Sequence, residues 1–304
     1  MVTMQEQKFG VEIELAGVPR RRIADAVAEG TGGRVTATHQ SGYDATIVTD
    51  PEGREWKIMN DTSIAIVNGH KGSEIVTPIL TYNDIELLQN VVRKVREVRA
   101  IAHTPSCSVH VHIDSAPHNP KSLSILAKMV YKNEDLIFDA LKVHPERRRR
   151  YTRPMDEEFI GKVVKRRPQT KQKLNEMWFG QYLEHPTRYD SRRYKGLNFN
   201  NLFRSIGTLE LRYFNMHGGK LHAGKIKAYI QFCLALSARA LNARSASHRK
   251  IQTDNPKFNF RVWLVSTLGM KGEEFKTARY HLTRYLPGNS AWRHGPPTST
   301  GTTS

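Results

Sequence analysis

Hydrophobic and polar residues alternate along three stretches of the chain, and this alternation predicts three β-strands. The stretches cover residues 7–15, 107–113 and 207–213, and shorter extended runs lie at 33–38, 55–59 and 73–77. Apolar residues return with a helical period of about 3.6 in longer segments, which predicts helices over 84–100, 121–142 and 222–244. Since strands and helices do not alternate regularly, the pattern favours an α+β fold over a doubly wound sheet or a TIM barrel.

Each of the three long predicted strands has one apolar face and one face with a pair of polar residues two positions apart. The pairs are Glu12 and Glu14, His110 and His112, and Glu210 and Arg212. Residues two apart share one face of a strand, so both members of a pair point the same way. A solvated face would more often mix Lys, Thr, Ser and Gln. Carboxylates, imidazoles and guanidinium groups instead bind divalent metal ions and phosphate.

The three pairs would meet if their strands were neighbours in one antiparallel sheet. Three carboxylates and two imidazoles would then lie on the same face of the sheet, which is enough for a metal site. Like charges at this spacing repel one another and raise some carboxyl pKa values unless a cation lies among them. Asp61, which ends one extended run, and Glu74, which begins another, are candidate additional carboxylates. Taken alone, either would be an ordinary surface acid in a turn.

Charge adds a second expectation. The chain has 304 residues, and its 47 Lys and Arg outnumber 29 Asp and Glu, which gives a net charge of +18. The excess lies in residues 147–304, with 31 basic and 10 acidic residues. Such a balance predicts a polyanionic partner: a nucleotide, a nucleic acid or an acidic peptide. The length suits one large domain or two small ones.

Cysteine content and hydropathy exclude several protein classes. Cys107 and Cys233 are the only cysteines, which excludes a disulfide scaffold and a cysteine-rich zinc ribbon and fits a reducing compartment. The N-terminus lacks the pattern of a signal peptide, and charged or polar residues interrupt the longest apolar stretch, near 226–241. We therefore expect a cytoplasmic protein with no membrane partner. The Gly-, Pro- and Thr-rich tail over 286–304 is expected to be disordered.

Two basic segments are candidates for binding anions. Residues 147–173 carry 11 basic and three acidic side chains, and residues 182–194 interleave tyrosines with arginines. Charge runs are usually solvated surface. Their functional interpretation is that arginines from these segments reach the phosphates of a nucleotide, while the surplus holds an anionic macromolecular substrate. The residues assigned to nucleotide binding are Arg153, Arg193, Lys195 and Arg212.

Five blocks of sequence, in order, resemble the putative amidoligase family of the carboxylate–amine ligase superfamily, which includes glutamine synthetase and glutamate–cysteine ligase. The similarity spans about residues 7–217, and no block is decisive alone. The blocks are Phe9 to Glu14, Trp56 to Ser63, Glu74 to Pro78, Cys107 to His112, and Leu197-Asn198 with Gly207 to Arg212.

The resemblance implies a curved antiparallel sheet with helices on its outer face and an active site on its concave face, as in glutamine synthetase. It also implies ATP-dependent formation of an amide or isopeptide bond through an acyl phosphate, with two or more Mg2+ or Mn2+ ions. The substrates would be a carboxylate and an amine, small or peptide-borne, and the oligomeric state is open. One catalytic domain would cover residues 1–285, with a basic helical part over 220–285 that matches no motif.

The resemblance also implies roles for individual residues. Metal ligands would be Glu12, Glu14, Glu74, His110, His112 and Glu210. Arg212 would contact the transferred phosphoryl group and act with Glu210 as a catalytic residue. Asp61 is a weaker match, grouped with Arg212 and Glu210 as a catalytic residue that supports the site rather than contacting metal.

Two other functions compete with the ligase. A zinc hydrolase could use His110, His112 and Asp114, with His103 and His118 nearby, but this leaves the paired acids and Arg212 unexplained. A non-catalytic nucleic-acid-binding protein would explain the charge and not the acids. Cys107 could act as a nucleophile with His110 or be a small buried residue, which is the more common case. The chain has no P-loop motif, and the glycines at 30–33 are interpreted as the end of a helix over 20–29.

Overall fold

The computed structural model describes residues 1–38, 44–102, 105–217 and 219–293. Within these ranges eight strands form one antiparallel sheet, in the order β2-β3-β4-β5-β1-β6-β8-β7. The strands are β1 (Phe9–Leu15), β2 (Arg34–Thr38), β3 (Thr46–Thr49), β4 (Glu55–Asn60), β5 (Ser73–Val76), β6 (Val109–Asp114), β7 (Leu197–Asn198) and β8 (Thr208–Phe214). The expectation of an α+β fold with an antiparallel sheet is confirmed.

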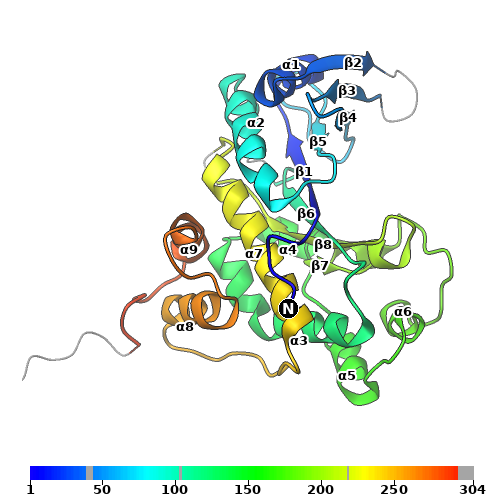
Figure 1. The fold of residues 1–304 in the computed structure, drawn as a ribbon, viewed down its shortest axis with the longest axis vertical. Helices are drawn as coiled ribbons and strands as arrows, with labels where there is room; N and C mark the ends of the chain where they lie inside the picture. Colours follow the sequence, from blue (N-terminus) through cyan, green and yellow to red (C-terminus); the bar gives the residue numbers. More distant parts are fainter. Residues whose placement is uncertain (39–43, 103–104, 218, 294–304) are drawn as a thin grey trace, which may run out of the picture.

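The helices are α1 (Arg20–Thr31), α2 (Ile85–Glu97), α3 (Pro120–Ala140), α4 (Pro145–Arg150), α5 (Glu157–Arg166), α6 (Lys171–Phe179), α7 (Ala223–Asn242), α8 (Pro256–Val262) and α9 (Lys276–Thr283). Helix α1 packs beside β3 and β4, α7 packs beside β6, and α3 packs on α7 (Figure 1). Helices α8 and α9 lie on the far side of α7 from the sheet. The long predicted strands and helices are confirmed, whereas the sequence pattern missed β3, β7 and the short helices α4, α5 and α6.

Local chemistry explains where the longest helix begins. Asn119 precedes α3, and its side chain accepts a hydrogen bond from the Ser122 backbone N–H, 2.9 Å away. The Ser122 hydroxyl accepts one in return from the Asn119 N–H, at 3.0 Å. Pro120 occupies the first turn, where no backbone donor is needed. These interactions confirm Asn119-Pro120 as the predicted helix start.

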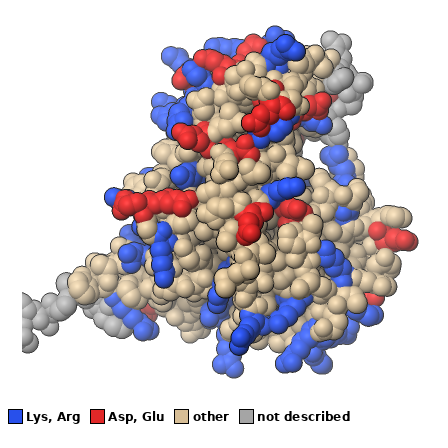
Figure 2. All heavy atoms as spheres, in the orientation of Figure 1, with Lys and Arg blue, Asp and Glu red and all other residues tan. Residues whose placement is uncertain are grey.

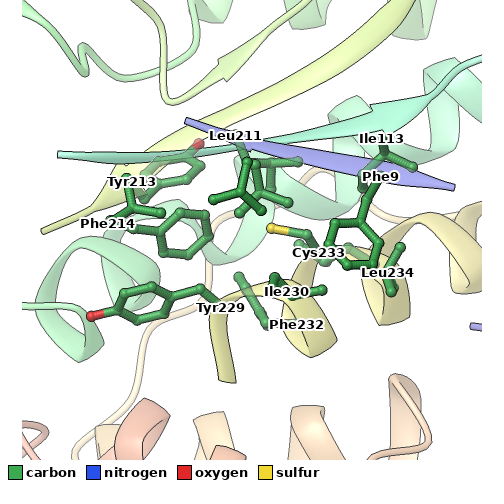
Figure 3. Packing of buried hydrophobic residues seen from close by; sticks show 14 of the residues in the cluster. Phe9, Ile113, Leu211, Tyr213, Phe214, Tyr229, Ile230, Phe232, Cys233 and Leu234 are labelled. Carbon is green, nitrogen blue, oxygen red and sulfur yellow. The ribbon is translucent and has the colours of Figure 1, made fainter. Parts of the chain in front are cut away.

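The sheet buries one face against α7. Figure 3 shows Phe9, Ile113 and Leu211 pointing from three neighbouring strands toward Ile230 and Phe232 of α7, and all five side chains are buried. Burying side chains of this size contributes about 1.5–3 kcal/mol each. The alternating polar residues of the same strands therefore point away from α7.

A β-bulge in β8 changes this alternation at one place. Val111 of β6 pairs with Leu211 and Val109 pairs with Phe214, so Arg212 and Tyr213 both lie opposite His110. Tyr213 and Phe214 consequently both reach the helical layer, as Figure 3 shows. The Tyr213 hydroxyl donates to Glu134 of α3 at 2.7 Å, and Phe214 stacks on Tyr229 of α7 with 4.5 Å between ring centroids. Arg212 is left on the polar face.

The edges of the sheet are irregular. The register of β2 against β3 shifts between Val35 and Ala37, and β7 at the other edge has two residues. An isolated parallel bridge between Arg153 and Lys195 continues that edge.

No helix in the described ranges is long and apolar enough to cross a lipid bilayer. The tail predicted over 286–304 lies outside the described residues from 294 onward.

Charged side chains are unevenly spread over the surface. In Figure 2 Lys and Arg dominate the lower part of the visible face, where α3 and α5 lie, and acids and bases mix over the end formed by β2 to β4. The charge asymmetry predicted from the sequence is thus also an asymmetry in space.

Glu134 makes stability depend on pH. Burial raises its pKa from an ordinary value of 4.5 to about 7, although Tyr213 and the Met155 N–H donate to it. Between pH 4.5 and 7 the unfolded chain releases a proton that the native protein keeps, so native stability falls as pH rises through this window. From pH 5 to pH 8 the loss should be about 2–3 kcal/mol. The free energy of unfolding, measured in urea, should change by this amount less between pH 5 and pH 8 in Glu134→Gln than in the unmodified protein. An equal change in the variant and the unmodified protein would contradict this.

Gly196 precedes β7 and lies against the ring of Tyr213. A Cβ at this position would lie 2.0 Å from Tyr213 Cε1, so Gly196→Ala must displace the ring and its hydrogen bond to Glu134. We expect a loss of about 1–3 kcal/mol in the free energy of unfolding, measured by urea denaturation. Gly161→Ala is the matched control, because nothing lies within 4 Å of its Cβ position in α5 and alanine favours a helix. Equal stability of the two variants would refute the close-packing argument.

Candidate active site

Chemically active side chains cross the polar face of the sheet in a row over β5, β1, β6, β8 and β7. The strand register places each of them opposite the next: Glu74 with Glu14, Glu12 with His110, His112 with Glu210, and Glu210 with Asn198. The adjacency assumed from the sequence is therefore present, and the three predicted pairs share one face. Six predicted metal ligands and Arg212 gather at the centre of the sheet.

His110 lies at the centre of this row. Its Nδ1 is 2.9 Å from Glu12 Oε2 and 3.5 Å from Glu210 Oε1. On the other side of the ring, Nε2 is 2.7 Å from the Ser108 hydroxyl and 3.8 Å from Glu14 Oε1. One imidazole thus contacts carboxylates from β1 and β8.

Two groups of side chains within the row can hold a metal ion. The first combines Glu12, His110 and Glu210, and the second combines Glu14, Glu74 and His110. In each group one ligand atom from every residue lies within 4.8 Å of the others. The groups share His110, so two neighbouring cations would be bridged by, or compete for, the same imidazole.

The pKa values at this site reflect crowded charges. Burial would raise the pKa of Glu12, but the imidazoles of His112 and His110 outweigh it and hold that pKa well below its ordinary value. Burial alone would lower the pKa of His112. The Glu12 carboxylate, 3.1 Å away, more than compensates for burial and raises the pKa of His112 to about 9. Glu74 differs, because burial and the carboxylates of Glu12 and Glu14 raise its pKa well above the ordinary value. A divalent cation between these carboxylates would replace the proton that Glu74 otherwise keeps.

Arg212 is held at one end of the row. Its guanidinium donates from Nη1 to Glu210 and from Nε to the Tyr151 carbonyl, at 3.3 Å. The guanidinium carbon lies 5.9 Å from the centre of the Tyr194 ring. Despite burial, the Arg212 charge holds the pKa of Glu210 at about 2. Glu210 also accepts a hydrogen bond from the Asn198 amide at 2.7 Å, so it is fixed from two sides and orients Arg212.

Arg147, Ser108 and Asn198 were missed as site residues. Arg147 of α4 is buried, and its Nη1 lies 4.0 Å from Glu14 Oε2. Burial lowers the pKa of this guanidinium to about 10. Nothing in the sequence distinguishes Arg147 from the three arginines that follow it. Ser108 donates to Glu14 and lies two residues before His110, so strand alternation could have identified it.

The remaining predicted site residues have other contacts. Asp61 follows β4, and its side chain accepts the Ser63 N–H at 2.7 Å in a turn. Its charge contributes to the raised pKa of Glu74, after burial and the carboxylates of Glu12 and Glu14. Asp61 therefore lies near Glu74 at the side of the row, and its role in the reaction stays a prediction.

In the part of the chain that the structure describes, the three predicted nucleotide-binding cations other than Arg212 do not contact the carboxylates of the row. Lys195 forms an ion pair with Asp156, Arg153 donates to the Ser191 carbonyl at 2.6 Å, and Arg193 donates to the Arg188 carbonyl at 3.0 Å. Arg153 and Lys195 line an open surface depression. Contact of these cations with a nucleotide stays a prediction.

The zinc-hydrolase alternative loses one expected ligand. Both ring nitrogens of His118 lie at hydrogen-bond distance from serine hydroxyls, 3.0 Å from Ser122 and 2.9 Å from Ser237. His118 was therefore wrong as a candidate ligand, and His103 lies outside the described residues. Asp114 accepts the Ala116 N–H at 2.9 Å. Cys107 is fully buried, as its interpretation as a small buried residue requires.

Comparison with known proteins assigns the family. No curated protein matches the chain. The family model described as a putative amidoligase enzyme matches residues 5–237. This range contains all eight strands of the described sheet and every member of the row of side chains across it. The chain belongs to the putative amidoligase enzyme family.

Proposed function

We propose that this protein is an ATP-dependent ligase that joins a carboxylate to an amine as an amide or isopeptide. The observation that carries the proposal is the pair of overlapping carboxylate–imidazole groups beside a fixed guanidinium on one sheet face. The family supports ligase chemistry in general, and the ATP dependence, the acyl phosphate and a glutamine-synthetase-like arrangement are part of the proposal.

The donor set fits divalent metal ions. Glu12, Glu14, Glu74 and Glu210 offer hard oxygen ligands, which suit Mg2+ or Mn2+, and His110 adds a nitrogen to both groups. The raised pKa of Glu74, caused by burial and by Glu12 and Glu14, indicates negative charge without a compensating cation. Two bound ions would neutralise ATP phosphates and the charge that develops during phosphoryl transfer.

The chemistry needs an activated carboxylate. A carboxylate has no good leaving group, so its oxygen first attacks the γ-phosphorus of ATP, and ADP leaves. The amine then attacks the carbonyl carbon of the acyl phosphate, inorganic phosphate leaves, and the amine loses a proton.

Arg212 can assist the phosphoryl transfer. Glu210 and the Tyr151 carbonyl hold the guanidinium in one orientation, so its remaining N–H groups can bind the transferred phosphoryl oxygens without reorganising. Preorganised contacts of this kind are worth about 3–4 kcal/mol in the transition state.

Nucleotide binding should depend on metal and on the first strand. We expect a non-hydrolysable ATP analogue to bind only with Mg2+ and to bind at least about tenfold more weakly to a Glu12→Gln, Glu14→Gln double variant. Isothermal titration calorimetry measures both effects without knowledge of the substrates. The control is the exposed pair Glu55→Gln and Glu158→Gln, which should bind as the unmodified protein does. Metal-independent binding, or full binding by the double variant, would refute the proposal.

Arg212 should matter for the transferred phosphoryl group more than for ADP. In Arg212→Lys a charge remains but the fork of N–H donors is lost. We expect affinity for ADP with aluminium fluoride and Mg2+, which mimics the transferring phosphoryl group, to fall by about 100-fold, while affinity for Mg-ADP stays unchanged. Equal losses for the two ligands would remove the phosphoryl-binding role. Thermal unfolding should confirm that the variant is folded.

A further inference from the structure

A second pocket, separate from the surface depression lined by Arg153 and Lys195, lies in the helical layer. It is on the opposite side of the sheet from the carboxylates. It has a volume of about 480 Å³ and is formed by α3, α5 and the segment that follows α7. Figure 2 shows Lys and Arg concentrated toward this lower end of the molecule. The pocket size is in the range of sites for small organic ligands.

Among the described residues, cations line this pocket without any acidic residue. The basic side chains around it are Lys121, Lys128, Arg167, Arg244 and His248. Throughout the described ranges, none of these side chains takes part in an ion pair or a hydrogen bond, in contrast to Arg54, which pairs with Asp50 and Asp84. Burial and the charge of Arg167 lower the pKa of Lys128. The pocket therefore has uncompensated positive charge, which an anion would neutralise.

Arg167 has a backbone conformation that favours glycine. It follows directly on the last residue of α5, with φ 44° and ψ 69°, in the left-handed region. Glycine occupies this C-terminal position in many helices because it lacks the Cβ that makes the conformation costly. An arginine here lines the pocket at the expense of backbone strain, which is a pattern found at functional positions.

The walls of the pocket are partly apolar. Ile125 of α3 and Val163 of α5 are buried beneath the cations, and Ala246 closes one side. An inorganic anion would use the charges alone, whereas a ligand with a flat or apolar body beside its phosphate would use both surfaces. A partly enclosed pocket also suits a small molecule better than an extended nucleic-acid strand.

We infer that this pocket binds a small phosphorylated compound of the size of a nucleoside monophosphate, with its phosphate held by Lys128 and Arg167. The site is distinct from the ligase function proposed above and does not depend on it. The phosphate would accept charge-assisted hydrogen bonds from both cations, and the apolar walls would cover the body of the ligand.

The test is calorimetric titration with AMP in the presence of EDTA, which prevents metal-dependent binding at the carboxylates. We expect AMP to bind, and Lys128→Met and Arg167→Gly each to weaken it about tenfold, which is the effect of losing one charge-assisted hydrogen bond. The Glu12→Gln, Glu14→Gln double variant should bind AMP as the unmodified protein does. This arm separates failure of the pocket from failure of the ligase proposal.

Arg167→Gly has a matched control in Lys142→Gly. Lys142 is also a cation with a left-handed backbone, at φ 48°, and it does not line the pocket. Both variants should keep or raise the melting temperature, and only Arg167→Gly should weaken AMP binding. The inference is overturned if AMP does not bind, if both pocket variants bind it normally, or if a single-stranded oligonucleotide binds where AMP does not.

Discussion

Concentrated negative charge on the middle strands is the constraint on which the rest of this structure depends. Four carboxylates on β5, β1 and β8 lie on one face of a sheet whose other face is apolar, so they cannot turn away from one another without losing the core against α7. The protein compensates with its own cations. His110 and His112 lie between the acids, Arg212 lies at one end, and Arg147 approaches from α4. The negative charge that these cations leave uncompensated favours the binding of a divalent metal ion.

The bulge in β8 allows this strand to supply residues to both the polar and the apolar face of the sheet. A regular strand would place Arg212 and Phe214 on the same side, and Phe214 would then occupy the polar face. Because an extra residue lies opposite His110, Arg212 stays with the carboxylates while Tyr213 and Phe214 both pack on the helices. The buried hydrogen bond from Tyr213 to Glu134 thus anchors β8 at the residue next to Arg212. The proposed chemistry depends on the orientation of the Arg212 guanidinium.

Strand alternation predicted much of the site, because residues two apart share a face wherever the strand is regular. That is why Glu12, Glu14, His110, His112, Glu210 and Arg212 could be grouped before the sheet order was known. Other features depend on packing that a single segment does not encode. Arg147 differs from the arginines after it only by burial, the bulge changes no residue type, and the cations of the second pocket come from three separate segments. The contacts of Arg153 and Lys195 likewise follow from the sheet edge.

The irregular edges of the sheet bear on how the chain avoids its own aggregation. Unpaired N–H and C=O groups on an edge strand can recruit a strand from another molecule. At one edge the register shift in β2 interrupts that row of donors and acceptors, and at the other β7 is two residues long and is followed outward by a single bridge to Arg153. Within the described residues, neither edge presents a long, regular template. The carboxylate-bearing strands lie at the centre of the sheet, where intermolecular pairing would have to displace several neighbours to reach them.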